Sequence, residues 1–238
     1  MTDLTSNGGG ELSNSVTFLG DFSQKLVTNT FFNFVGRFWS FLVILLLTPY
    51  ILSRLNVSEF GVWILLSVFA GTFNLLDLGL GSSFIKYISE YHTHQDRDRI
   101  NRALCLGLIF YGAFGMGVMV LGHLLRPFLF GVFRIEADPT VYLLVLISFS
   151  INNIALMLLS TLKGLQRMDQ SNAVEIKMSL PNLIGTIVFL EAGLGMLGLA
   201  LNAVFVAVVT TLTAWWTLRR VDPEIRVGWY LDRDLLKE

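Results

Sequence analysis

Long apolar runs, separated by short polar segments, fill the chain from residue 31 to residue 218. A transmembrane helix needs about 20 mostly apolar residues. Six segments of that kind fit the pattern: Phe31 to Leu52, Phe60 to Ile85, Ala103 to Leu125, Thr140 to Leu162, Val174 to Ala192, and Leu197 to Leu218. We therefore expect an all-α polytopic membrane protein whose six transmembrane helices form one bundle over residues 31–218.

The overall composition supports a membrane location. Hydrophobic residues make up 53% of the chain and charged residues 15%, whereas a soluble globular chain carries about a quarter charged residues. The formal net charge of -1 gives no reason to expect a nucleic-acid partner. Cys105 is the only cysteine and lies in an apolar run, so an intrachain disulfide is excluded and a buried thiol is expected.

The two ends of the chain are more polar than the middle. Residues 1–30 lack the basic start, short apolar run and small-residue cleavage site of a signal peptide. Their apolar residues recur at helical spacing, which favours an amphipathic helix on the membrane surface, with a flexible tail as the alternative. Residues 219–238 mix leucines with charged residues and are expected to form a C-terminal surface segment.

Lys and Arg are distributed unequally between the two sides of this topology. The N-terminal segment, the loops after the second and fourth spans and the C-terminal segment carry 13 of them, and the opposite side carries three. Those of the loop after the fourth span are Lys163, Arg167 and Lys177. The three on the opposite side are Arg54, Arg126 and Arg134. Because cytoplasmic loops are enriched in Lys and Arg, both termini are expected in the cytoplasm.

Arg37 and Asp77 are the ionisable residues that lie well inside predicted spans. At about 1.5 Å per residue, Arg37 lies about 9 Å and Asp77 about 13 Å from the cytoplasmic face. A short loop joins the first two spans, so they are expected to be neighbours. Asp77 is then tolerated in the membrane because it faces Arg37 or a hydrated cavity. The alternative is an ion pair whose role is to fix the register of the two helices.

Asparagines add further polar groups to the predicted spans or their ends. They are Asn33, Asn74, Asn152, Asn153, Asn182 and Asn202. Each amide needs a protein partner or water within the membrane. Singly they are better explained as hydrogen bonds between helices than as ligands, but together they suit a water-filled interior. The candidate substrate-binding residues are Arg37, Asp77, Asn33, Asn74 and Asn152.

Glycines and a proline within the spans favour close packing or bending. Gly112, Gly115 and Gly117 are expected to allow either close backbone approach to the third span or local bending of it. Gly79 and Gly81 have the same expected role near the end of the second span. Pro181 should interrupt the hydrogen bonding of the fifth span and bend it.

Motifs for covalent chemistry are missing from the chain. It contains no Gly-x-x-x-x-Gly-Lys phosphate loop, no His-Glu-x-x-His zinc helix and no Gly-x-Ser-x-Gly nucleophile elbow. His92 and His94 lie in a charged loop without a third metal ligand at suitable spacing, so a solvated loop is expected there. We expect neither an enzyme nor a bound cofactor or metal.

Three stretches, in order along the chain, resemble a known family. They are NTFFNFVGRFWSFLVILLLTPYILSRLNVSEFGVW (residues 29–63), LLDLGLGSSFIKYISEY (residues 75–91) and KGLQRMDQSN (residues 163–172). The chain is similar here to the polysaccharide-biosynthesis flippases, the Wzx-type transporters of O-antigen and exopolysaccharide. These belong to a larger exporter superfamily that includes the MATE antiporters.

The resemblance implies a fold, a substrate and roles for two residues. Members enclose a central cavity between two helical bundles in the cytoplasmic (inner) membrane. They accept an undecaprenyl-pyrophosphate-linked oligosaccharide at the inner leaflet and release it outside by alternating access. By resemblance, Arg37 would attract the anionic pyrophosphate or an acidic sugar, and Asp77 would gate the cavity or couple to an ion.

The resemblance covers only the N-terminal half of such a transporter. Either the chain is a truncated product, or its expected partner is a second six-helix lobe, from another chain or a second copy of this one. Two other functions stay open. One is a MATE-like cation or drug antiporter, for which Asp77 and Glu191 are the available acidic groups. The other is a non-transporting membrane partner of glycosyltransferases or a polymerase.

Overall fold

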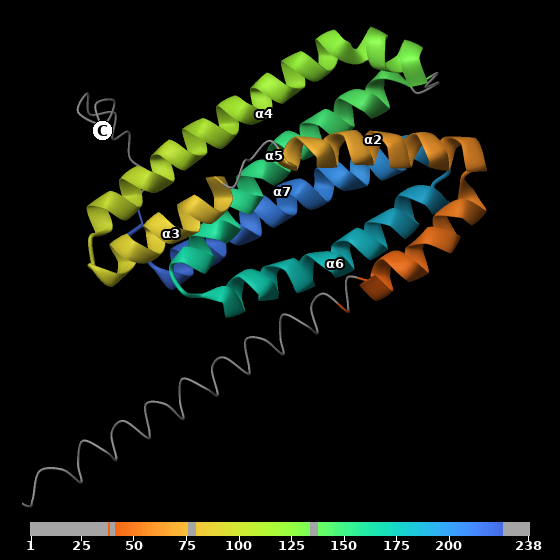
Figure 1. The fold of residues 1–238 in the computed structure, drawn as a ribbon. Coiled ribbons are helices and arrows are strands. Elements are labelled where there is room, and N and C mark those ends of the chain that lie inside the picture. Colours follow the sequence, from red (N-terminus) through yellow and green to blue (C-terminus); the bar gives the residue numbers. More distant parts are fainter. Residues whose placement is uncertain (1–37, 39–40, 76–79, 134–137, 226–238) are drawn as a thin grey trace, which may run out of the picture.

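The structure is a computed structural model that describes Phe38 and residues 41–75, 80–133 and 138–225. Every regular element within these ranges is an α-helix. The first is Phe41–Arg54. It is followed by α2 (Val57–Leu75), α3 (Leu80–Thr93), α4 (Arg97–Phe133), α5 (Pro139–Gly164), α6 (Met168–Glu191) and α7 (Gly195–Val221). From α3 onward, successive helices run back and forth between the two ends of one bundle (Figure 1).

Four of the predicted spans are confirmed. They correspond to α4, α5, α6 and α7, each long and apolar enough to cross a membrane. α4 extends past both predicted limits, Ala103 and Leu125, because the polar turns of residues 97–102 are helical and because the helix continues through Arg126 and Pro127 into the apolar residues up to Phe133. Its 37 residues span about 56 Å, more than the hydrocarbon core of about 30 Å.

The first two predicted spans correspond to shorter described helices. Part of the first is the helix Phe41–Arg54, and residues 31–37 lie outside the described part of the chain. The second, predicted as one helix from Phe60 to Ile85, is divided between α2 and α3, with residues 76–79 outside the description. The count of six spans therefore stays a prediction. The proposed surface helices at the two ends also lie outside the described residues, apart from the stretch up to residue 225.

Polar residues at the connections determine where the helices begin. Asn56 and Glu59 form a reciprocal capping box at the start of α2, in which the Glu59 amide donates to Asn56 Oδ1 at 2.8 Å and the Asn56 amide donates to Glu59 Oε2 at 3.2 Å. Asp138 caps α5 by accepting a hydrogen bond from the Thr140 amide at 2.7 Å. This hydrogen bond lowers the pKa of the Asp138 carboxyl below its usual value. Pro139 then occupies the first turn, where a missing amide hydrogen costs least.

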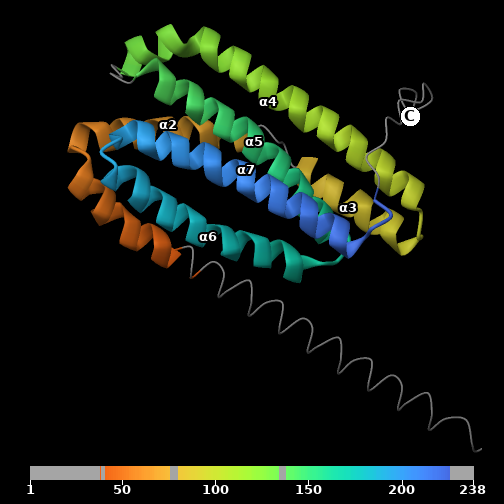
Figure 2. The ribbon, with the colours of Figure 1, turned by 180° about the vertical axis from the view of Figure 1, so that it is seen from behind.

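α5 is the central helix of the bundle. It contacts α3, α4, α6 and α7 (Figure 2). One core cluster joins α3, α4, α5 and α7 and includes Ile88, Leu104, Leu158 and Leu218, each at most 1% exposed. A second cluster joins α2, α4, α5 and α7 around Leu66. The helices that flank α5 are therefore fixed by apolar packing on several sides.

Small residues permit close contacts along α5, as the sequence partly predicted. A Cβ on Gly115 of α4 would lie 3.2 Å from the Cα of Ser150, so this prediction of close approach is confirmed. A Cβ on Gly112 or Gly117 would meet nothing within 4 Å, so neither glycine makes a close approach within the described part of the chain, and their alternative role in bending the span stays a prediction. Gly164 supplies a tighter approach, to α3, that the sequence did not reveal.

The connection from α3 to α4, the connection from α5 to α6 and the end of α7 lie at one end of the bundle (Figure 1), and this end carries basic residues such as Arg97, Arg167 and Arg219. The other end has Arg54 at the close of the first helix and Arg126 in the last turns of α4. Lys177, which was counted with the loop after the fourth span, lies inside α6. That assignment was wrong because Asp169, Glu175 and Lys177 make the start of α6 look like a loop.

Candidate functional site

Most of the predicted site lies outside the described residues. Arg37, Asn33 and Asp77 fall in segments that the structure does not describe, and Asn74 lies in α2 with its side chain outside the description. The pairing of Arg37 with Asp77 therefore stays a prediction. Asn152 is the one candidate whose side chain is described.

Asn152 lies at the middle of α5 and is half-buried. Among the described residues it has no hydrogen-bond partner. Its neighbour Asn153 differs, because its buried amide donates to the Phe149 carbonyl at 2.9 Å. An amide at mid-membrane depth without a protein partner needs water or a ligand. This is what the predicted water-filled interior requires of an asparagine, and the part of Asn152 in substrate binding stays a prediction.

Ser148, Asn152 and Lys163 form a polar stripe on α5. At about 100° per residue, the three lie within about 60° around the helix axis. The Lys163 Nζ is 3.2 Å from the Glu175 Oε1 of α6, so this side of α5 faces toward α6. The sequence analysis did not identify this stripe. The spacings of four residues from Ser148 to Asn152 and of eleven from Asn152 to Lys163 were a signal for it.

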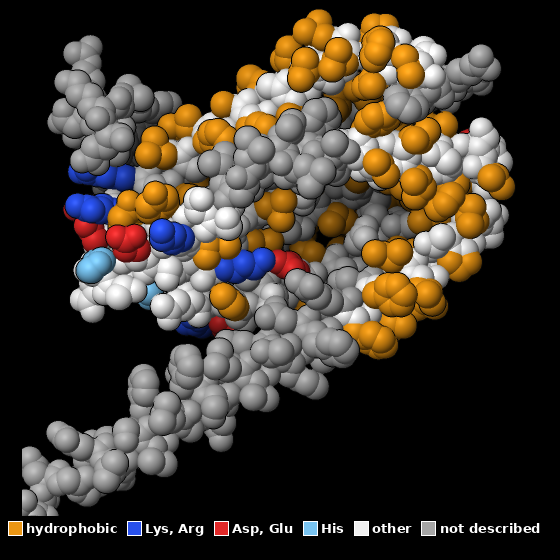
Figure 3. All heavy atoms as spheres, in the orientation of Figure 1, with side chains coloured by type: hydrophobic (Ala, Val, Ile, Leu, Met, Phe, Trp, Pro, Cys, Tyr) orange, Lys and Arg blue, Asp and Glu red, His pale blue; other side chains and the backbone are white. Residues whose placement is uncertain are grey.

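The face of the molecule drawn in Figure 3 is hollowed between α2 and α6. Hydrophobic side chains cover most of the drawn surface around the hollow, while charged side chains gather toward the end where α3 meets α4. This distribution is typical of a membrane protein that is apolar outside and carries its charges at one end. The polar stripe of α5 lies on the side of that helix turned toward α6.

Asn202 joins α7 to α6 rather than facing a cavity. Its Nδ2 donates to Asn182 Oδ1 and Thr186 Oγ1, both at 3.0 Å, and it is 2% exposed. Its Oδ1 is buried against Gly185, where an added Cβ would lie only 2.0 Å away. Asn182 and Asn202 therefore form hydrogen bonds between helices, which is the role expected of such asparagines singly.

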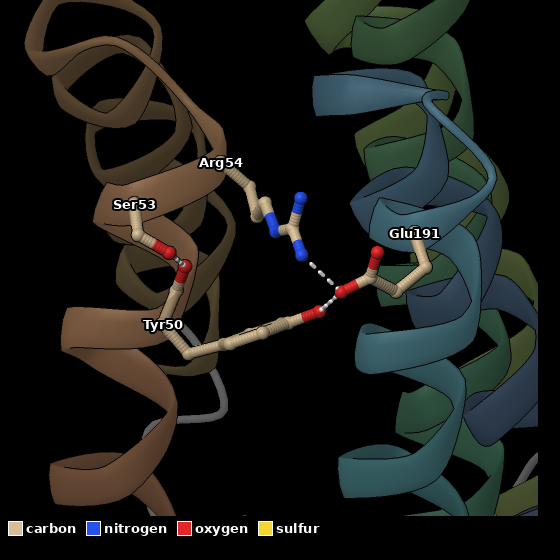
Figure 4. A network of polar contacts seen from close by, with 4 residues as sticks. All are labelled: Tyr50, Ser53, Arg54 and Glu191. Atoms are coloured by element: carbon tan, nitrogen blue, oxygen red, sulfur yellow. Dashed lines mark hydrogen bonds and ion pairs between the residues drawn. The ribbon is translucent and has the colours of Figure 1, made fainter.

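Glu191 is held at the opposite end of the bundle by the first helix. The Tyr50 hydroxyl donates to Glu191 Oε1 at 2.8 Å, and an Arg54 guanidinium nitrogen forms an ion pair with the same oxygen (Figure 4). Tyr50 and Arg54 are one turn apart, so both reach the end of α6 together. The carboxylate is thus already neutralised by a protein cation.

We predict that Arg54 and Glu191 are coupled weakly in stability. Their side chains are 46% and 48% exposed, and exposed ion pairs are worth roughly 0.2–1 kcal/mol. Alanine at each position and at both defines a double-mutant cycle, measured by thermal unfolding in detergent. The cycle should give a coupling free energy in that range, with Arg126→Ala as the control. Strictly additive losses would contradict the contact.

At the other end, Arg97 ties α4 to the segment after α7. Its guanidinium is 3.1 Å from Asp222 Oδ1 and also pairs with Glu224. Ile225, which follows, is 3% exposed within the first core cluster. Arg167 pairs with Asp169 at 3.3 Å in the connection before α6. The contacts of Arg97 thus join the start of α4 to the segment after α7, whereas the Arg167 pair lies within the connection between α5 and α6.

Comparison with known proteins identifies the class of this membrane protein. A family model described as "Polysaccharide biosynthesis protein" matches residues 26–225. The chain belongs to this family, and the membership indicates a membrane transport role in polysaccharide synthesis. Neither the search of curated proteins nor the search of solved structures returned a match.

Proposed function

We propose that the chain is a flippase, or the N-terminal lobe of one, for a lipid-linked oligosaccharide. The substrate would be an undecaprenyl-pyrophosphate-linked repeat unit, moved from the inner to the outer leaflet of the cytoplasmic membrane. The observation that carries this proposal is Asn152, a half-buried amide at the middle of α5 with no hydrogen-bond partner among the described residues. A polar, hydrated surface at that depth suits the passage of a sugar chain.

The proposed roles of the other residues follow the path of the substrate. Arg37 would attract the pyrophosphate or an acidic sugar, and Asp77 would gate the cavity or couple to an ion. Asn33, Asn74 and Asn152 would offer amides to the sugar hydroxyls, since an amide both donates and accepts hydrogen bonds. A second six-helix lobe, or a second copy of the chain, would close the cavity from the opposite side.

The acidic side chains that the structure describes favour a cation antiporter less than they favour a flippase. A cation cavity needs unpaired acidic groups, and Glu191 is already paired with Arg54 and hydrogen-bonded by Tyr50. The excess of Lys and Arg at one end supports a membrane orientation with both termini in the cytoplasm. Assembly with glycosyltransferases or a polymerase is compatible with transport and would bring the carrier lipid to the same place.

The proposal is tested in a cell that lacks its own oligosaccharide flippase. Expression of the native coding region should restore surface polysaccharide, and its loss should leave lipid-linked repeat units at the inner leaflet. The accumulated lipid is measured by extraction and mass spectrometry. Restored surface polysaccharide without any change in the accumulated lipid would contradict a role in translocation. Dye efflux coupled to a proton or sodium gradient would instead support the antiporter.

A further inference from the structure

α3 has three sides with different surroundings. Phe84 lies toward α4, because its ring is 3.2 Å from the position that a Cβ on Gly107 would take. Ile88 lies toward α5, where it packs against Gly164. The third side is polar and, at about 100° per residue, is turned away from α4. It carries Ser82, Lys86, Ser89 and Thr93, at spacings of four, three and four residues.

Lys86 is the cation of this polar side, and α3 contains no other Lys or Arg. Its side chain is exposed and forms no hydrogen bond or ion pair with any residue that the structure describes. Glu90 follows one turn later, but no ion pair joins these two residues. A cation at the end of a predicted span without a carboxylate partner is available to an anion from outside the chain.

Lys163 on α5 lies at the same level of the bundle as Lys86. Ile88 meets Gly164 where α3 packs on α5. Lys86 precedes Ile88 by two residues, and Lys163 precedes Gly164 by one. Both helices run toward the end where α5 meets α6 (Figure 1). At about 1.5 Å per residue, the two lysines therefore lie within roughly 2 Å of one level.

The polar side of α3 and the polar stripe of α5 border the same space. Figures 1 and 2 place α4 and α6 on opposite sides of α5. The side of α3 that is turned away from α4 is therefore turned toward α6. Lys163 also points toward α6, where its Nζ is 3.2 Å from Glu175 Oε1. Basic and acidic side chains lie at the edge of the hollow that is nearest this end (Figure 3).

These surroundings favour an anion that carries an apolar tail. Lysine is a compact point charge and a common ligand of phosphate groups. Two lysines at one level suit a diphosphate, which holds several negative charges close together. Hydroxyl groups on the same side of α3 are additional hydrogen-bond donors. The hydrophobic side chains around the rest of the hollow leave the tail in contact with apolar surface.

We propose that Lys86 binds a phosphate of the diphosphate group in the lipid-linked oligosaccharide. Lys163 is the second contact, and the diphosphate replaces Glu175 as its ionic partner. This exchange costs little, because the Lys163 and Glu175 side chains are 33% and 49% exposed and exposed ion pairs are weak. The inference rests on the proposed function and adds two residues to its site.

Native mass spectrometry of the purified full chain in detergent tests this contact, with undecaprenyl diphosphate as the probe. Wild type should retain the probe. Lys86→Met should bind it at least about tenfold more weakly, because a hydrogen bond to a charged group is lost. Lys86→Arg should keep most of the binding. Arg220→Met removes an exposed cation from the last turn of α7, at the same end of the bundle. It is the control for total charge and should bind as wild type does.

Glu175→Gln distinguishes substrate binding from a purely structural ion pair. This variant removes the competing carboxylate and frees Lys163, so it should bind undecaprenyl diphosphate several-fold more tightly than wild type. A pair that only holds α5 to α6 predicts equal or weaker binding, and that result would remove Lys163 from the site.

Other probes identify the source of the phosphate. Inorganic diphosphate and phosphatidylglycerol should both be retained less well than undecaprenyl diphosphate. Equal retention of undecaprenyl diphosphate by wild type and by folded Lys86→Met overturns the proposal, as does a wild type that retains none. A preference for phosphatidylglycerol that Lys86→Met abolishes also overturns it, because Lys86 then binds a phospholipid headgroup.

Export in a cell that lacks its own flippase separates a failure of this contact from a failure of the proposed function. If wild type and Lys86→Met restore surface polysaccharide equally, the function stands and the contact is wrong. If wild type restores none, the proposed function fails and the contact falls with it.

Discussion

Replacing Arg37 with alanine is expected to abolish surface polysaccharide in a cell that depends on this chain for export. The residue stands about 9 Å inside the predicted first span, where a lone cation is costly and is retained for a function or a partner. Without the guanidinium, the anionic pyrophosphate loses its attraction into the cavity. The measurement is surface polysaccharide by gel and blotting, together with the amount of lipid-linked repeat unit inside the cell.

Two further variants separate function from stability in this test. Arg37→Lys keeps the charge and should restore part of the export, whereas Arg37→Met keeps the length of the side chain and should not. Arg220→Ala removes an arginine from the end of α7 and should leave export unchanged. Normal export by Arg37→Ala at a normal protein level would remove Arg37 from the site. A loss of the protein itself would point to an ion pair that holds the helices in register.

The long apolar helices could be read directly from the sequence. Twenty apolar residues in a row are a strong signal, and α4 to α7 follow it. Helix ends were predicted less well, since α6 begins with Asp169, Glu175 and Lys177 among its first turns. The hydropathy of a segment indicates whether it can lie in the membrane. It does not indicate at which residue the helical backbone hydrogen bonding ends. The second predicted span contains α2 and α3, and whether they form one span stays a prediction because residues 76–79 lie outside the description.

The candidate substrate-binding residues stay predictions, and the physical reason for naming each of them can be stated. Asn152 stood out because an amide in an apolar run is costly wherever it faces hydrocarbon. The polar stripe from Ser148 to Lys163 was missed, because Lys163 was assigned to a loop and its partner Glu175 lies on another helix. Glu191 was weighed as a cation ligand, and only the tertiary contact with Arg54 shows that its charge is already paired.

Alanine at Gly164 is expected to destabilise the bundle by about 1–3 kcal/mol, the usual cost of overpacking a core. Gly164 is buried at the end of α5, and an added Cβ would lie 2.6 Å from both Cβ and Cγ2 of Ile88 on α3. Ile88 is 0% exposed, so it has no free space into which to turn. The backbones of α3 and α5 must therefore separate. Thermal unfolding in detergent measures the loss.

Gly131→Ala on α4 is the matched control, because a Cβ there would meet nothing within 4 Å. That variant should be as stable as wild type or slightly more so, since alanine is the better helix former. Ile88→Ala should cost stability alone by leaving a cavity. In combination with Gly164→Ala, however, it removes the overlap with Cγ2 of Ile88 while the overlap with Cβ stays, so the clash is relieved in part. The double variant should lose less stability than the sum of the two single losses. Additive losses would mean that α3 and α5 do not meet at Gly164.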